Sequence, residues 1–167
     1  IMHYFYPIET IHVDPKGMSK NVNHEVLPFQ RSSADIIDPG SKEVLVKKGR
    51  RFVRNIIEKL KRANVERIPI DPSELADKFA ADDIVDKKTG EVIVNFNELI
   101  TEPKLDQIKS ADVKEFRIFY IDNVSVVASL RSTILADKIK TREDSITEIY
   151  KKFRPTDPPT LSVAESF

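Results

Sequence analysis

The sequence contains no cysteine among its 167 residues. This absence excludes disulfides, thiol catalysis, zinc ribbons and iron–sulfur ligation, and it is typical of proteins from a reducing compartment. A chain of this length can bury about 70% of the surface that its unfolded form exposes, so it needs no covalent cross-links. The sequence therefore predicts one large or two small domains that are held together by ordinary packing.

Long apolar runs, a signal segment and an excess of charge are also lacking. No stretch approaches the ~18 uninterrupted apolar residues that a membrane helix needs. The N-terminal "IMHYFYPIET" lacks the basic, apolar and small-residue series of a signal peptide. Lys plus Arg and Asp plus Glu both number 27, whereas proteins that coat DNA usually carry a basic excess. Because the chain starts without Met and stops inside "TLSVAESF", we expect both ends to be boundaries within a longer protein.

What the sequence does contain is an internal repeat. "EVLVKKGRRFVRNIIEKLKRANVERIPI" (43–70) and "EVIVNFNELITEPKLDQIKSADVKEFRI" (91–118) align without a gap at an offset of 48 residues. Each copy predicts a strand, a helix and a second strand, because a β-branched run precedes apolar residues at helical spacing and a further apolar alternation. Seven positions are identical: Glu43/Glu91, Val44/Val92, Val46/Val94, Lys61/Lys109, Ala63/Ala111, Val65/Val113 and Ile70/Ile118. The charged residues mostly differ, so we interpret the repeat as scaffold.

The segments around the repeats predict further strands and one clear helix. Residues 4–13 alternate apolar and polar side chains, which indicates a strand interrupted at Pro7. "HEVLPFQ" (24–30) is a second strand candidate, and 79–85 a third. "NVSVVASLRSTILAD" (123–137) is ambiguous between strand and helix, whereas "REDSITEIYKKF" (142–153) predicts a helix that ends at "RPTDPP". The predicted fold class is α+β.

Few residues offer catalytic or metal-binding chemistry. His3, His12 and His24 have spacings that match no metal-ligand pattern, so we interpret them as surface or packing residues. The acidic cluster Asp82, Asp83 and Asp86 lies beside a lysine-rich hairpin tip, which favours a solvated loop over Mg²⁺ binding or acid–base work. No nucleophile motif and no phosphate-binding glycine loop is present. We therefore expect no catalytic residue and no metal site.

Two basic stretches are the candidate binding residues. "KKGRR" puts Lys47, Lys48, Arg50 and Arg51 at the strand-to-helix turn of the first repeat, and the second repeat replaces it with "NFNEL". The turn is either a solvated basic loop or a contact for phosphate or a partner.

The second stretch, "EIYKKFRPTDPPTLSVAESF", joins a helix with an aromatic face to a proline-rich turn that carries Arg154. A proline-restricted turn can hold an arginine for a phosphate or base contact at low entropic cost. The alternative is an ordinary helix end with cations that extend to solvent.

The second stretch resembles a signature of the β subunit of bacterial DNA-directed RNA polymerase. In that family a helix ending in Glu-Ile-Tyr runs into Arg-Pro-Gly-Glu-Pro-Pro-Thr, followed by Ala-Glu-Ser and Phe. Here Glu148-Ile149-Tyr150 precedes "RPTDPPT" (154–160) and Ala164-Glu165-Ser166-Phe167. Thr156 stands in place of the usual Gly, and Asp157 in place of Glu. "VLVKKGRRFVRNIIEKL" and "DDIVDKKTGEVI" also look like the family's proteobacterial form, in which a lineage-specific insertion interrupts the β lobe.

The resemblance implies how the chain is divided. Residues 1–25 and 137–167 would be parts of the β lobe, and residues 26–136 the insertion, with its tandem repeats at 43–70 and 91–118. In this family the lobe is one wall of the cleft that holds DNA. The resemblance therefore implies a non-catalytic part of a nucleotidyltransferase that acts in transcription, located in the cytoplasm with the nucleoid.

The resemblance also implies site residues and partners. Arg154 is the first candidate for contact with the melted DNA strand, and Lys151, Lys152 and Asp157 are weaker candidates beside it. The expected partners are the rest of β, the β′, α and sigma subunits, DNA in the cleft and regulators at the insertion. The family's catalytic Mg²⁺ is held by an aspartate triad of β′, and this chain has no Asp-x-Asp-x-Asp run.

Two other functions remain open from the sequence. The repeats could form a free-standing protein–protein interaction module that is unrelated to transcription. A small enzyme is disfavoured, because nucleophile motifs, metal-ligand patterns and phosphate loops are all missing.

Overall fold

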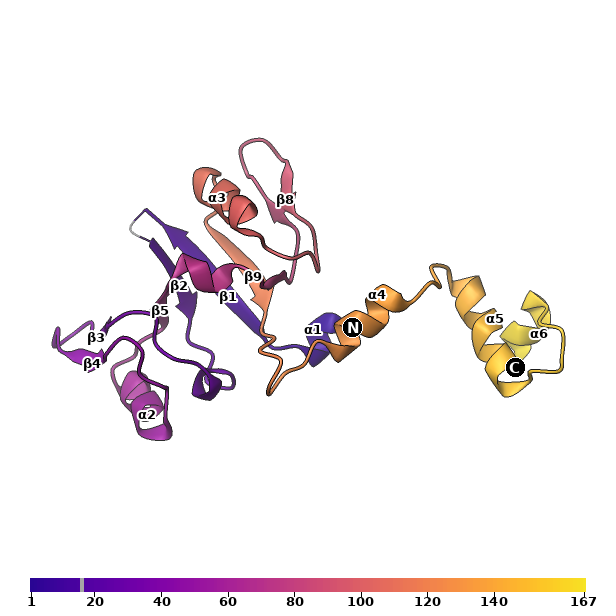
Figure 1. The fold of residues 1–167 in the computed structure, drawn as a ribbon, viewed down its shortest axis with the longest axis horizontal. Coiled ribbons are helices and arrows are strands. Elements are labelled where there is room, and N and C mark those ends of the chain that lie inside the picture. Colours follow the sequence, from indigo (N-terminus) through magenta and orange to yellow (C-terminus); the bar gives the residue numbers. More distant parts are fainter. Residues whose placement is uncertain (16) are drawn as a thin grey trace. The chain divides into compact units, whose positions relative to one another are not determined.

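A computed structural model gives the structure of residues 1–15 and 17–167. These residues form two compact units, 1–127 and 128–167 (Figure 1). The first unit contains strands, two α-helices of nine residues and short helical turns, and the second contains helices alone among the described residues. The predicted α+β class is confirmed.

A five-stranded antiparallel sheet organises the first unit, in the order β5-β2-β1-β9-β6. Its middle is a hairpin of β1 (Ile8–Asp14) and β2 (Gly17–Asn21). The strand that ends the first repeat, β5 (Arg67–Ile70), pairs with β2, and the strand that ends the second, β9 (Glu115–Phe119), pairs with β1. In Figure 1 the two repeats consequently lie on opposite sides of the hairpin. The edge strand β6 (Phe79–Ala80) completes the sheet beside β9.

Both repeats have the predicted order of strand, helix and strand. In the first copy β4 (Val44–Val46) and α2 (Arg54–Arg62) precede β5. In the second, β8 (Val92–Val94) and α3 (Glu102–Ser110) precede β9. Each copy also begins with a further short strand, β3 (Ile36–Ile37) or β7 (Ile84–Val85), which pairs antiparallel with β4 or β8. The repeated unit is therefore strand–strand–helix–strand.

Equivalent hydrogen bonds show that the repeat starts earlier than the sequence analysis predicted. The N–H of Phe52 donates to the carbonyl of Gln30, and the N–H of Ile100 donates to that of Lys78, 48 residues on. The Asp35 carboxylate accepts from the N–H of Lys48 at 2.7 Å, and its counterpart Asp83 accepts from Phe96 at 2.6 Å. The identities Asp35/Asp83, Ile36/Ile84 and Asp38/Asp86 carry this signal in the sequence. The repeat therefore includes the segments that begin near residues 30 and 78.

The two hydrophobic cores repeat in the same way. Seven buried residues form the core of the first copy: Leu27, Ile36, Val46, Phe52, Leu60, Val65 and Ile68. Their counterparts 48 residues later all belong to the core of the second copy: Leu75, Ile84, Val94, Ile100, Ile108, Val113 and Phe116. Repetition of the buried positions with changed charges is the behaviour expected of a scaffold, because burial sets the fold while exposed positions vary freely.

Some local predictions were wrong. The predicted strand at 24–30 is a turn followed by the 3₁₀ helix η1 (Leu27–Phe29), which has Pro28 in its first turn. The segment before Pro7 is the short helix α1 (Met2–Phe5) instead of a strand. The predicted strand at 79–85 is divided between β6 and β7, which belong to different sheets. A second 3₁₀ turn, η2 (Pro72–Leu75), links the two copies.

The second unit consists of α4 (Ser129–Ala136), α5 (Arg142–Phe153) and α6 (Leu161–Ser166). The predicted helix at 142–153 is confirmed as α5, and the ambiguous segment forms α4. Thr141 caps α5 by accepting the N–H of Asp144, with acidic residues in the first turn and lysines in the last, as the helix dipole favours. Tyr150 of α5 and Ala164 of α6 are the buried residues of the helical hairpin.

Candidate functional site

The basic turn of the first repeat presents all four of its predicted cations to solvent. Lys47, Lys48, Arg50 and Arg51 are exposed. The backbone is fixed beneath them, because the N–H of Gly49 donates to the carbonyl of Ser32 at 2.7 Å. Gly49 has a φ of +78°, which glycine adopts without strain. The turn thus presents exposed cations from a rigid backbone.

The equivalent turn of the second repeat shows that the fold does not require these cations. The N–H of Asn97 bonds to the carbonyl of Ala80 at 2.8 Å, as Gly49 does to Ser32. Here the charge is compensated within the turn. Glu98, at the position of Arg50, pairs with Lys104 and accepts the backbone and side-chain N–H groups of Asn95. The Lys104 bond and those from Asn95 lower the pKa of Glu98 to about 2. The first turn keeps the backbone geometry and adds net positive charge.

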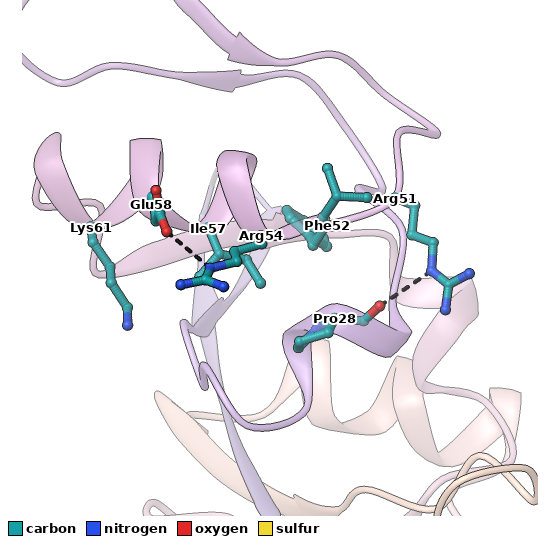
Figure 2. Close-up of a pocket in the computed structure, with 8 residues that line it drawn as sticks. Pro28, Arg51, Phe52, Arg54, Ile57, Glu58 and Lys61 are labelled. Carbon is teal, nitrogen blue, oxygen red and sulfur yellow. Dashed lines mark hydrogen bonds and ion pairs between the residues drawn. The ribbon is translucent and has the colours of Figure 1, made fainter.

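A groove runs beside the basic turn, with a volume of about 540 Å³. It lies between α2 and η1, and Figure 2 shows Arg54, Ile57 and Lys61 of α2 on the side where Pro28 lies. The lining residues are Pro28, Arg51, Phe52, Val53, Arg54, Ile57, Glu58 and Lys61. The groove therefore combines apolar side chains with three cations, and it was not predicted from the sequence.

Two of the three cations of the groove have a partner among the residues that line it. The Arg51 Nε–H donates to the Pro28 carbonyl at 3.3 Å, and Arg54 pairs with Glu58 at 3.2 Å (Figure 2). The Arg54 side chain is 94% exposed, so this pair contributes little to stability. Arg54 also occupies the first turn of α2, where the helix dipole disfavours a cation. Helix stability does not explain the charge at this position.

A buried ion pair supports the segment on which the basic turn rests. The Lys20 Nζ on β2 lies 2.9 Å from the Glu9 Oε1 on β1, and both side chains are more than 90% buried. Gln30 bonds to both, and its own backbone carbonyl accepts from Phe52. This pair was not predicted from the sequence. The sequence pattern that indicates burial of Lys20 is its position two residues after the buried Met18, which puts both on the same face of β2.

In the second unit, Arg154 begins the turn between α5 and α6 and contacts two other residues. Its Cζ lies 5.3 Å from the centre of the Phe167 ring, and its Nη1 lies 3.6 Å from the Asp157 carboxylate. More than half of the side chain, 56%, remains exposed. Phe167 also packs edge-on against Tyr150. The structure therefore brings Arg154 and Asp157 together and leaves the guanidinium accessible.

Two lysines, Lys151 and Lys152, precede this turn in α5, and Thr156 lies within it. Both lysines are exposed in the last turn of α5, and the Lys151 Nζ lies 3.8 Å from the Glu148 carboxylate. Thr156 is not among the residues with positive φ. The turn therefore accepts a threonine without strain where the resembled family has glycine.

The remaining polar clusters of the first unit have structural partners. The His3 Nε2 lies 2.6 Å from the Ala81 carbonyl, and the His12 Nε2 lies 2.8 Å from the Asn21 side chain. Asp82 pairs with Arg117. Within residues 1–15 and 17–167, no three His, Asp or Glu side chains gather in a way that could hold a metal ion.

Asp122 fixes the chain where it leaves the sheet after β9. Burial alone would raise its pKa, but N–H groups of Val126, Val124 and Ser125 and the hydroxyl of Tyr120 donate to its carboxylate. Together these bonds hold the pKa of Asp122 well below its usual range. Its role is to shape the loop that ends the first unit.

Curated proteins of known identity resemble the chain over nearly its whole length. No protein-family model matches it. The DNA-directed RNA polymerase subunit beta of Sorangium cellulosum is 45% identical over 167 residues, that of Anaeromyxobacter sp. (strain Fw109-5) 43% over 165, and that of Syntrophotalea carbinolica 42% over 166. Each alignment covers at least 98% of this chain. The chain belongs to the bacterial RNA polymerase β family, of which it matches one segment.

The match confirms the resemblance that the sequence motifs indicated. The chain spans 12% of the length of each of these curated β subunits. Among the described residues, no helix has the length and apolar character that would let it cross a membrane. The basic turn, the groove and the turn that carries Arg154 all lie in a chain that aligns with one segment of these longer subunits.

Proposed function

We propose that this chain is a non-catalytic part of the β subunit of a DNA-directed RNA polymerase and acts in transcription. The observation that supports this best is 42–45% identity to three bacterial β subunits over nearly the whole chain. The rest of β, β′, α and sigma would be its partners, in the cytoplasm with the nucleoid. The nucleotidyl transfer and its Mg²⁺ would then belong to β′, whose aspartate triad holds this ion in the resembled family.

Within that role, residues 137–167 would form part of the lobe wall of the DNA cleft, and residues 26–136 an external insertion. Residues 1–25 also contribute to the sheet of the repeats, since β1 pairs with β9 and β2 pairs with β5, the last strands of the two copies. The β1–β2 hairpin would then anchor the insertion to the lobe. Removing residues 30–135 would leave both outer edges of this hairpin unpaired, so surface substitutions test the insertion better than deletion.

Arg154 is our proposed contact to DNA. A guanidinium binds a phosphate well because its fork of donors matches the phosphate oxygens, and here the aromatic ring of Phe167 supports it. Lys151 and Lys152 would add positive charge from the end of α5. Because a carboxylate repels phosphate, Asp157 would not contact the DNA backbone itself. It would position Arg154 through their ion pair.

Replacing Arg154 by alanine in the full polymerase should shorten the lifetime of the promoter open complex about fivefold, the equivalent of about 1 kcal/mol for one charge-assisted contact. The slope of log lifetime against log salt should fall by about one, because one fewer counterion is displaced. The measurement is open-complex decay after heparin challenge at several salt concentrations.

Arg142→Ala is the matched control, because Arg142 is exposed at the opposite end of the same helix. Asp157→Asn should give a smaller effect and leave the salt slope unchanged. An Arg154→Ala polymerase with unchanged lifetimes on several promoters would remove Arg154 from the DNA interface.

The repeats are our proposed docking surface for regulatory proteins. Lys47→Asn with Arg50→Glu gives the first turn the residues that the second repeat carries at the same positions, so the fold should be retained. In the full polymerase this double variant should weaken the effect of regulators that enter the secondary channel on open-complex lifetime. The expected loss is about threefold or more, because one surface cation is removed and another is replaced by an anion. Full effect of every such regulator would argue against docking at this turn.

A free-standing interaction module has no support from the comparisons, because the relatives described above are all polymerase β subunits.

A further inference from the structure

The groove of the first repeat differs from the equivalent surface of the second repeat in both charge and exposure. Arg51 and Arg54 correspond to Leu99 and Glu102. Ile57 is only half-buried on the groove floor, whereas its counterpart Leu105 is 3% exposed. The same scaffold therefore closes over its helix in one copy and stays open in the other.

The open groove exposes apolar side chains that are not buried in the core of the first repeat. Val53 is 48% exposed at the start of α2, where the second repeat has Thr101. Together with Pro28 and Ile57 it forms an apolar floor, and Phe52 beneath it is almost fully buried. A volume of about 540 Å³ lies within the range of ~300–1,000 Å³ that is typical of binding pockets. Exposed apolar side chains in such a hollow indicate an occupant with an apolar group.

The charge around the floor selects the kind of occupant. Arg51, Arg54 and Lys61 line the groove, and Glu58 is its single acidic residue. The exposed Arg54–Glu58 pair leaves most of the guanidinium open to a carboxylate from outside. A basic rim around an apolar floor complements an acidic segment that carries a large apolar side chain. Nucleic acid fits less well, because stacking needs an exposed aromatic face and Phe52 is buried.

We propose that this groove is the docking site for a short acidic segment of a partner protein, which inserts one large apolar side chain between Pro28, Val53 and Ile57. The partner's carboxylates pair with Arg51, Arg54 and Lys61. This inference rests on the proposed docking role of the repeats and names the chemistry of the partner.

Site-specific photocrosslinking in the full polymerase tests the site. A photoreactive p-benzoylphenylalanine replaces Val53 in one enzyme and its counterpart Thr101 in a second. The probe is a short labelled peptide of glutamates with a single phenylalanine. Two control peptides replace the phenylalanine by serine or the glutamates by lysines.

We expect the acidic phenylalanine peptide to crosslink at position 53 and not at position 101, and both control peptides to crosslink weakly. Lys61→Glu should weaken binding of the acidic peptide about tenfold in fluorescence anisotropy, since it replaces a favourable charge with a repulsive one. Lys109→Glu is the matched control, because Lys109 occupies the same position in the second repeat, and it should leave the affinity unchanged.

Several results would overturn the proposal. Equal crosslinking at positions 53 and 101 would mean that the peptide does not distinguish the groove from the equivalent surface of the second repeat. Equal crosslinking of the serine peptide would mean that charge alone attracts the probe. Displacement of the peptide from position 53 by a short single-stranded DNA would make the groove a nucleic-acid site. A crosslink between two β subunits without peptide would make it a contact between copies. Unchanged affinity in Lys61→Glu would also reject it.

The peptide experiment and the Lys47→Asn/Arg50→Glu variant together separate two cases, one in which only the groove proposal is wrong and one in which the docking role is wrong. If the peptide does not bind but Lys47→Asn/Arg50→Glu still weakens the regulators, the docking role stands and the groove is rejected. If both experiments fail, the docking role itself is wrong.

Discussion

Replacing Leu60 by alanine should lower the free energy of unfolding of the chain by about 2–5 kcal/mol, because it removes buried apolar surface and leaves a cavity. Leu60 is fully buried in the core of the first repeat, and its counterpart Ile108 is fully buried in that of the second. Ile108→Ala should therefore have an effect of similar size. Urea denaturation followed by far-ultraviolet circular dichroism measures both.

The controls for these substitutions are the neighbouring residues Lys61 and Lys109, which are also equivalent and are exposed. Their replacement by alanine should change the free energy by less than about 0.5 kcal/mol. Because β5 and β9 both pair with the β1–β2 hairpin, the two repeats should unfold in one transition. Two separate transitions, of which each substitution shifts only one, would show that the shared sheet does not couple the repeats.

Replacing Lys20 by methionine should destabilise the chain by about 3–5 kcal/mol, because it leaves the buried carboxylate of Glu9 without its counter-charge. The side-chain amide of Gln30 would remain as a partner, but it carries no charge. Urea denaturation at neutral pH measures the loss.

The double variant Glu9→Leu with Lys20→Met should recover most of this loss, because it replaces both charges by apolar side chains of similar size. A double-mutant cycle gives the coupling between the two residues. Strictly additive effects would mean that the pair is not formed in solution. The exposed pair Lys109–Asp106 should show coupling of less than about 1 kcal/mol.

The repeat and its buried positions were predictable because they depend on local patterns. Val46, Leu60 and Val65 recur 48 residues later as Val94, Ile108 and Val113, and both sets are buried. The helix at 142–153 was predictable for the same reason, since Thr141 provides a cap and "RPTDPP" prevents continuation. In contrast, the apolar pattern predicts a repeat that begins at Glu43, because the short strands β3 and β7 have only two residues each and give no periodic signal.

The candidate site was only partly predictable. The sequence placed the four cations of the basic turn and Arg154 in loops, where they are exposed. It did not predict that Phe167 and Asp157 contact Arg154, since these contacts require α6 to pack against α5. It also missed the groove, because Ile57 and Leu105 look equivalent in sequence and differ only in how their surroundings cover them.

The sequence by itself determined the duplicated unit, the positions that each copy buries and, through the motif around Arg154, the β family to which the chain belongs. These properties depend on the order and spacing of side chains along the chain. Tertiary structure alone decided that β5 and β9 join one sheet through the β1–β2 hairpin, that Lys20 and Glu9 are buried together, and that the first repeat keeps an open groove. Each depends on contacts between distant segments, where the packing of the whole unit decides which side chains are covered and which remain available to a partner.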